Sequence, residues 1–189
     1  MNEQSPLPAV VAWEAVARCV LRSAVLLAQR RLRLPRASVG LQLHFADGTS
    51  GTVYRETRVD RLAPVEPCLL VVEFQLRGVR SPTGHALFRA ESLLNTPLFA
   101  GFPGLVSKLW VAADEHGVYR GVYEWDGADR AECYARSLWR VLALVSVPGS
   151  IRFRVVPGLR RTQVLANPSL LGAGSPARGA DGWRLVGVG

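Results

Sequence analysis

The chain has 189 residues, 49% of them hydrophobic and 20% charged, a length and composition that suit one packed domain and exclude a wholly disordered chain. Its formal net charge of +8 comes almost entirely from arginine, but the arginines are scattered, so we do not expect nucleic-acid binding. The three cysteines have no CxxC spacing, and the sequence does not start with a signal-peptide pattern. We therefore expect a reduced cytoplasmic protein without disulfides or structural zinc.

Residues 8–33 have the pattern of a long helix. Glu14, Arg18 and Arg22 follow one another at four-residue intervals as one narrow polar stripe, and the rest of the circumference is apolar. These charges argue against a transmembrane span. The wide apolar face needs a partner surface, so we expect it to pack against the core or a second subunit. Attachment to a membrane surface through residues 8–36 is the alternative.

A β-hairpin is expected after this helix. Residues 39–45 alternate between apolar and polar side chains, residues 47–51 have the composition of a turn, and residues 52–59 alternate again. Two prolines within residues 61–67 indicate a linker. Residues 1–67 are therefore predicted to form an N-terminal extension, a helix plus a β-hairpin.

A regular order of elements follows the linker. The expected elements are a strand at 68–76, a helix at 83–99, strands at 105–111 and 118–125, a helix at 128–145 and a strand at 150–156. This βαββαβ order predicts an α+β fold of the ferredoxin-like type over residues 68–157, with an antiparallel sheet and both helices on one of its faces.

The second face of such a sheet needs a cover. A second subunit, the N-terminal hairpin, or both are the candidates. Residues 158–189 are rich in Gly, Pro, Ser and Ala, a composition that predicts a flexible tail, either mobile or draped over the domain.

One set of motifs connects this domain with a known family. Pro103 and Gly104 precede Lys108 and Trp110, the strand 120–125 reads Arg-Gly-Val-Tyr-Glu-Trp, and Ala131, Ala135 and Leu138 follow on a helix. With these motifs, residues 69–156 resemble the YdhR-like monooxygenase family of the dimeric α+β barrel group. The resemblance implies a homodimer, a pocket between sheet and helices in each subunit, and cofactor-independent oxygenation of aromatic polyketides. The short members of that family lack residues 1–67.

Lys108, the only lysine of the chain, lies in an apolar run that predicts a buried strand. Buried ammonium groups change their pKa readily and suit acid–base or anion-orienting work. Lys108 and Trp110 share one side of their strand, and on the next strand Gly121 leaves room beside Tyr123, which together would admit a flat apolar ligand. The predicted substrate-binding residues are Trp110, Tyr119, Trp125, Tyr134, Trp139 and His85. A core or dimer interface is the alternative explanation of this aromatic stripe.

Glu73 is the acidic candidate. If it lies across the sheet from Lys108, the two form an ion pair that depresses the carboxylate pKa, and without that partner a desolvated Glu73 is a candidate base. The predicted catalytic residues are therefore Lys108, Tyr123 and Glu73. No histidine pair has metal-ligand spacing and no Gly-rich loop opens a helix, so neither a metal nor a nucleotide cofactor is expected.

These observations favour a small cofactor-independent enzyme of secondary metabolism. It would mono-oxygenate an apolar polycyclic or polyketide-like substrate, with Lys108 and Tyr123 stabilising an enolate or peroxide-like anion. A cyclase or isomerase would need nearly the same pocket. A non-catalytic module that binds a ligand or docks a partner is the rival hypothesis, because a fold alone does not determine chemistry.

Overall fold

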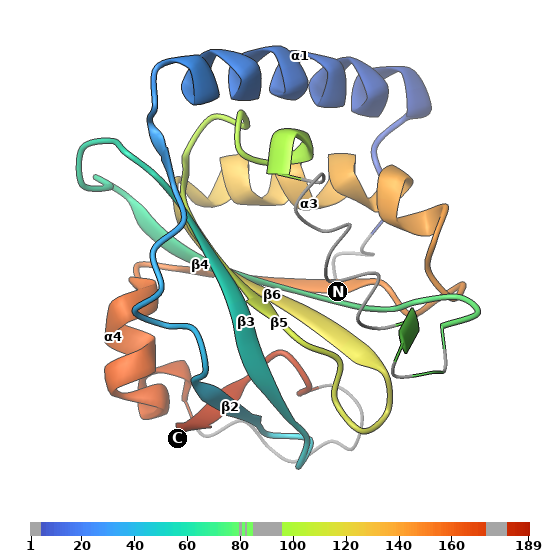
Figure 1. Cartoon of the computed structure of the whole chain (residues 1–189), viewed down its shortest axis with the longest axis vertical. Helices are drawn as coiled ribbons and strands as arrows, with labels where there is room; N and C mark the ends of the chain where they lie inside the picture. Colours follow the sequence, from blue (N-terminus) through green and yellow to red (C-terminus); the bar gives the residue numbers. More distant parts are fainter. Residues whose placement is uncertain (1–4, 80, 82, 85–95, 173–180) are drawn as a thin grey trace.

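An antiparallel sheet forms the centre of the computed structural model, which describes residues 5–79, 81, 83–84, 96–172 and 181–189 (Figure 1). Its central strands are β4 (Pro67–Gln75), β5 (Leu105–Val111), β6 (Val118–Asp126) and β7 (Arg152–Pro157). They lie in the order β7-β4-β6-β5, and all neighbours are antiparallel. The first and third strands are thus central and the other two flank them, as in interleaved split βαβ units. The predicted α+β, ferredoxin-like class is confirmed.

Helix α3 (Ala128–Ala143) covers one face of the sheet. Its buried side chains Ala131, Tyr134, Ala135 and Leu138 recur at the spacing of one helical face, which is why this stretch folds as an amphipathic helix. The other predicted helix, at 83–99, falls largely on residues 85–95, outside the described residues. Its end is described as a 3₁₀ turn, η1 (Thr96–Leu98).

The predicted hairpin extends the sheet. Strand β2 (Gln42–Phe45) pairs with β3 (Ser50–Val59) in antiparallel register, which confirms this prediction. Gly48 has a φ of +87°, a turn conformation that glycine adopts without strain. Strand β3 also pairs with β5, and a register shift between Val53 and Arg55 lies where it passes from one partner to the other.

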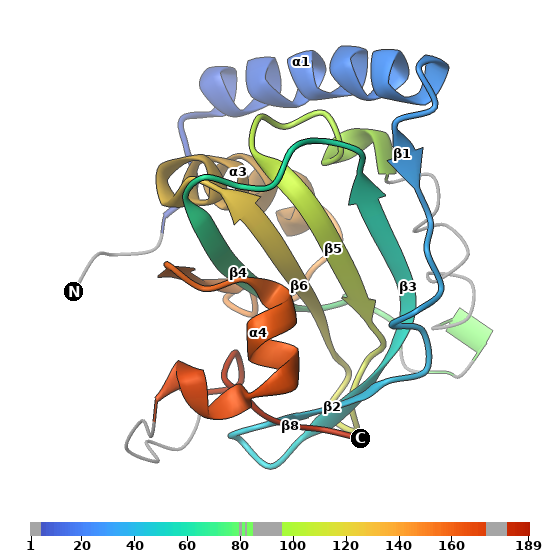
Figure 2. The same ribbon diagram turned by 90° about the vertical axis from the view of Figure 1, so that its left-hand side faces the viewer.

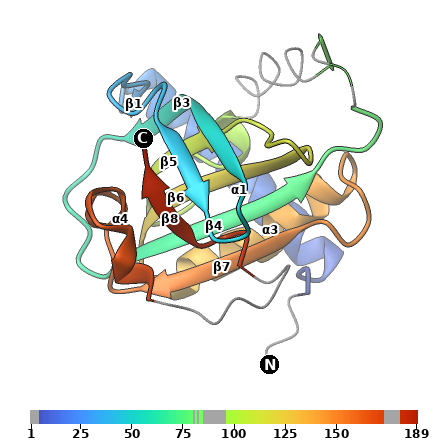
Figure 3. The same cartoon turned by 90° about the horizontal axis from the view of Figure 1, so that it is seen from below.

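The C-terminal segment covers the second face of the sheet (Figures 2 and 3). It contains α4 (Arg161–Ala166), a 3₁₀ turn η2 (Pro168–Leu171) and β8 (Leu185–Val188), which pairs with β2. Val164 and Leu185 are 1% and 3% exposed and pack against side chains of β4, β5 and β6. The described parts of residues 158–189 are therefore folded onto the domain, which agrees with a draped tail and not with a mobile one. A few apolar anchors outweigh the Gly- and Pro-rich composition.

Helix α1 (Ala9–Ala28) is the outermost layer on the opposite side, above α3 and η1. It ends earlier than the predicted residue 33, because β1 (Leu32–Arg33) pairs with β3. Ser23, on the buried side of α1, donates a hydrogen bond of 2.9 Å to the Pro97 carbonyl.

The expected packing of the N-terminal helix against the core is thus present on one face of α1. Val10 and Leu21, on the other face, are 71% and 69% exposed. Among the described residues, no helix is long and apolar enough to cross a membrane.

Candidate functional site

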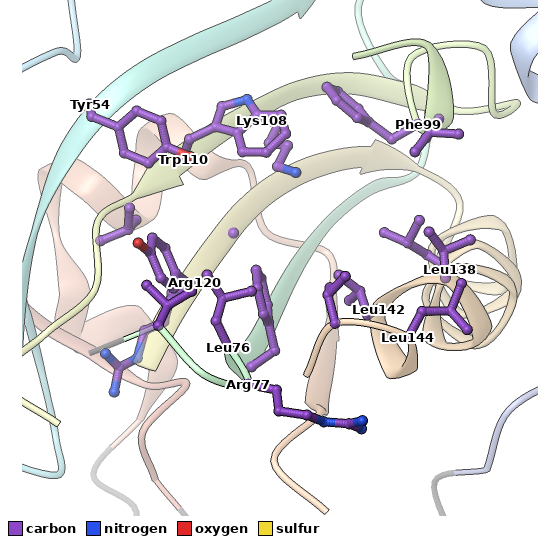
Figure 4. A pocket seen from close by; sticks show the side chains of 18 of the residues that line it. Tyr54, Leu76, Arg77, Phe99, Lys108, Trp110, Arg120, Leu138, Leu142 and Leu144 are labelled. Carbon is purple, nitrogen blue, oxygen red and sulfur yellow. The ribbon is translucent and has the colours of Figure 1, made fainter. Parts of the chain in front are cut away.

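A cavity of about 730 Å³ lies between the sheet and the C-terminal half of α3 (Figure 4). Its walls are mainly apolar and aromatic, and they include Tyr54, Phe74, Phe99, Trp110, Tyr119 and Leu138. Leu144 and Val145 also line it and are 67% and 48% exposed, so the cavity reaches the surface there. Its size and lining are those of a site for a small apolar molecule.

Lys108 projects from β5 toward this cavity and is only 6% exposed. Its Nζ atom lies 3.2 Å from the ring centroid of Trp110, 4.4 Å from that of Phe99 and 4.8 Å from that of Tyr123. No carboxylate of the described residues pairs with it. Burial, with a smaller contribution from the Arg55 charge, lowers the pKa of Lys108 well below its usual value. Burial therefore disfavours the ammonium form of Lys108, and it acts against the attraction of the three ring faces for a cation.

A pair of buried phenols lies next to this amine. The Tyr134 hydroxyl donates a hydrogen bond of 3.0 Å to the Tyr123 hydroxyl. Burial raises the pKa of both tyrosines, so both phenols keep their protons. Because Tyr123 accepts from Tyr134, its own proton remains to be donated to a molecule in the cavity.

Gly121 makes room for Tyr123. A Cβ atom at Gly121 would lie 2.6 Å from the Tyr123 ring, so Gly121→Ala is expected to push that ring from its place and to reshape the cavity. We expect the variant to bind N-phenyl-1-naphthylamine, a fluorescent apolar probe, about tenfold more weakly, a change of about 1.4 kcal/mol. Gly187→Ala is the control, because its Cβ would meet His44 at an ordinary 3.5 Å. Equal affinity of Gly121→Ala and wild type would contradict the positioning role.

Arg55 is a site residue that the sequence did not reveal. Its guanidinium carbon lies 4.1 Å from the centroid of the Trp110 ring, and its side chain is buried on β3. One amino group donates to the Thr96 hydroxyl at 2.8 Å, while Nε and Nη1 have no hydrogen-bond partner among the described residues. The pairing of β3 with β5 brings Arg55 close to Lys108. This pairing joins distant parts of the chain, and no local pattern in the sequence indicates it.

Glu73 lies on the other face of the sheet and does not pair with Lys108. Glu73 is opposite Arg120 in the β4–β6 register, and Lys108 is opposite Tyr123 in the β5–β6 register. Side chains alternate between the faces of a strand, so Arg120 and Tyr123, three positions apart on β6, point to opposite faces. Glu73 accepts a hydrogen bond of 3.3 Å from Arg120. Burial raises the pKa of Glu73, and the Arg120 charge opposes that rise. The structure therefore separates this predicted catalytic carboxylate from the cavity.

Arg120 is the centre of a buried ionic cluster beside the C-terminal segment. It contacts the carboxylates of Asp47, Glu73 and Asp114 at 3.0, 3.3 and 2.6 Å. It also donates to the carbonyl oxygen of Gly182 at 2.8 Å. The cluster therefore ties the β2–β3 turn, the β5–β6 turn and the C-terminal segment to the sheet.

The remaining predicted residues divide between cavity and core. Trp110 and Tyr119 line the cavity, and Tyr119 stacks on Phe74 with centroids 5.7 Å apart. Trp125 is fully buried against Tyr134, with centroids 4.9 Å apart, and neither ring lines the cavity. Trp139 packs against Phe153 with centroids 6.1 Å apart, as part of the core. His85 lies outside the described residues.

No protein-family model matches the chain, and no curated protein matches it. A ferredoxin-fold protein from Listeria monocytogenes, related to antibiotic biosynthesis monooxygenases, is similar in structure. Its identity is 15% and its TM-score 0.39, over 58% of this chain and 64% of that one. An anthrone oxidase-like protein has 13% identity and a TM-score of 0.38, over 58% of this chain and 54% of that one. Both matches span less than two thirds of the solved chain. Similarities this distant say nothing about the reaction, and the resemblance to the YdhR-like family stays a prediction.

Proposed function

We propose that the chain is an enzyme that deprotonates an apolar aromatic substrate in the cavity and lets the resulting anion react with dioxygen, without a cofactor. The observation that carries the proposal is the Lys108 amine. It faces an apolar cavity of about 730 Å³, lies over aromatic rings, and has no acidic partner among the described residues. An uncharged amine held in this way is a base, and the ammonium that it becomes is a counterion for the anion it has made.

The residues around Lys108 support a proton-transfer step. The amine takes a proton from an acidic C–H or O–H group of the substrate. The ammonium ion then lies beside the substrate anion, and the Tyr123 hydroxyl donates a hydrogen bond to the oxygen on which negative charge accumulates. The mainly apolar walls of the cavity strengthen these contacts. Trp110, Tyr119 and Phe99 supply flat surfaces against which an aromatic ring stacks.

Anthrone is a suitable probe substrate, because its CH₂ group is acidified by the ring carbonyl. Its anion passes an electron to dioxygen, and the two radicals combine to a carbon-bound peroxide. The peroxide loses water, so that one oxygen atom becomes the new carbonyl and the other leaves with two hydrogens. Anthrone and dioxygen thus give anthraquinone and water, and the substrate itself is the reductant.

The test measures dioxygen uptake and anthraquinone formation with purified protein. Wild type is expected to accelerate both, and the rate should rise with pH until the Lys108 amine is fully uncharged, since only that form accepts a proton. Tyr123→Phe should slow the reaction while leaving the pH profile in place. Proton exchange of the probe from D₂O without dioxygen uptake would indicate a cyclase or isomerase instead. Tight binding with neither reaction would indicate a non-catalytic binding protein.

A further inference from the structure

We infer that Lys108 also captures carbonyl ligands covalently, its amine condensing with an aromatic aldehyde or ketone in the cavity to form an imine. This activity goes beyond the proposed oxygenation, because it needs no dioxygen and leaves the ligand bound to the chain. The two reactions share the uncharged amine but fail independently, since capture requires attack on a carbonyl carbon and oxygenation requires removal of a proton.

The surroundings of Lys108 are those of a nucleophilic amine. Lysine attacks carbonyl groups when it is desolvated or lies next to another cation, because both conditions oppose its protonation. Lys108 is only 6% exposed, which supplies the first condition. The second is the Arg55 charge, which also lowers the pKa of Lys108; both cations contact the Trp110 ring, Nζ at 3.2 Å and the guanidinium carbon at 4.1 Å from its centroid. The titratable groups around it on the described elements are Arg55 and Tyr54 of β3, Tyr123 of β6 and Tyr134 of α3, and Tyr119, Arg77 and Arg120 also line the cavity. None of these groups is a carboxylate that would hold the ammonium form.

The phenol pair can handle the protons of the condensation. The amine lone pair forms the new C–N bond, the carbonyl oxygen leaves as water, and the two amine hydrogens account for the hydrogens of that water. Tyr123 is placed to donate a hydrogen bond to the departing oxygen, and the hydrogen bond of 3.0 Å that it accepts from Tyr134 orients its hydroxyl. An apolar cavity also disfavours the return of water, which would hydrolyse the imine.

The cavity selects the class of carbonyl compound. Its volume of about 730 Å³ is that of a typical small-molecule site. The rings of Phe99, Trp110 and Tyr123 lie near the amine, and Tyr119 lines another part of the cavity. A fused aromatic ring carrying an aldehyde or ketone therefore fits better than a small aliphatic or strongly charged one.

The single lysine makes the test direct, because Lys108 and the N-terminal amine are the only primary amines of the chain. The protein is incubated at pH 7 with 2-naphthaldehyde and sodium cyanoborohydride, which reduces an imine to a stable secondary amine. Intact mass and peptide mapping then give the rate of naphthylmethyl addition at each amine. We expect Lys108 to be labelled at least about tenfold faster than an exposed lysine, and Lys108→Met to lose that label.

A relocated lysine provides the matched control. The double variant Lys108→Met, Arg18→Lys has its one lysine on α1, where the wild-type arginine side chain is 70% exposed. Labelling of Lys108 no faster than that of the exposed lysine, or labelling of the N-terminal amine alone, would overturn the inference. Circular dichroism and N-phenyl-1-naphthylamine binding establish that each variant is folded with its cavity.

The Arg55→Gln variant tests whether Lys108 is labelled because its amine is nucleophilic or only because the amine is accessible. Removing the second cation should shift the pH profile of Lys108 labelling to higher pH and slow labelling at pH 7 several-fold. An unchanged profile would contradict the role of Arg55. Labelling of Lys108 without dioxygen uptake on anthrone would support imine formation and refute the proposed oxygenation. Dioxygen uptake without labelling of Lys108 would support the oxygenation and refute imine formation.

Discussion

Lys108→Met is expected to abolish turnover of the probe substrate and, at the same time, to stabilise the fold. Loss of the base should lower the rate about 10²- to 10⁴-fold, the usual contribution of a positioned proton acceptor. Methionine has a similar shape and no polar group to bury, so the free energy of unfolding should rise by about 1–3 kcal/mol at pH 7, the usual cost of an unsatisfied buried polar group. Opposite effects on activity and stability are typical of a functional residue.

The stability gain should depend on pH in a defined direction. Burial lowers the pKa of Lys108 in the folded chain, so between that pKa and its ordinary value of 10.5 the unfolded chain binds more protons. The stability of wild type therefore rises with pH across this window, while that of Lys108→Met lacks this contribution. Urea denaturation at pH 7 and pH 10 should show the difference between the two proteins shrinking at the higher pH.

An exposed residue on a neighbouring strand is the control. Arg58 lies opposite Ser107 in the β3–β5 pairing and is exposed. Arg58→Met should change stability by no more than about 0.5 kcal/mol. A Lys108→Met protein that is less stable than wild type at pH 7 would show that the amine is held by contacts that stabilise it, and the case for a free base would be lost.

Arg120→Met is expected to cause the largest loss of stability, about 3–5 kcal/mol at pH 7, because it removes one side of a buried ionic cluster. The arginine side chain is 1% exposed and contacts Asp47, Glu73 and Asp114. Without it these carboxylates repel one another away from water, and the Gly182 carbonyl loses its donor. The C-terminal segment would then lose one of its attachments to the sheet.

The loss should be smaller in acid. Burial already raises the pKa of Glu73, and without the opposing Arg120 charge it rises further, so protonation of Glu73 near pH 4 relieves the repulsion in the folded state. Urea denaturation at pH 7 and pH 4 tests this. Arg130→Met is the matched control, since Arg130 is 55% exposed and lies 3.5 Å from Asp126. It should cost less than about 1 kcal/mol. Equal losses for the two arginines, or a loss for Arg120→Met that does not change with pH, would refute the explanation.

The parts of the fold that the sequence predicted are those set by local pattern. Alternation on either side of Asp47 and Gly48 identifies the hairpin, and the apolar spacing of residues 128–143 identifies α3. Strands β4 and β5 of the ferredoxin-like core are mainly apolar runs bounded by turns, which is typical of strands buried on both faces. Lys108 stood out as the only lysine of the chain, within one of these runs.

The parts that the sequence could not predict depend on contacts between distant segments. Arg55 meets Trp110 only because β3 pairs with β5, and Glu73 meets Arg120 because the two are opposite one another in the β4–β6 register, which turns the Glu73 side chain away from Lys108. The C-terminal segment is ordered because single apolar residues such as Val164 and Leu185 are buried. The average composition of the segment does not reveal such single residues.

The C-terminal segment also bears on how the protein behaves at low concentration. The resemblance to dimeric α+β barrels predicts a homodimer, but here α4 and β8 already cover the second face of the sheet. If the proposed enzyme works as a single chain with this covered sheet, its specific activity should stay constant on dilution, whereas an enzyme whose cavity is built from two subunits should lose activity.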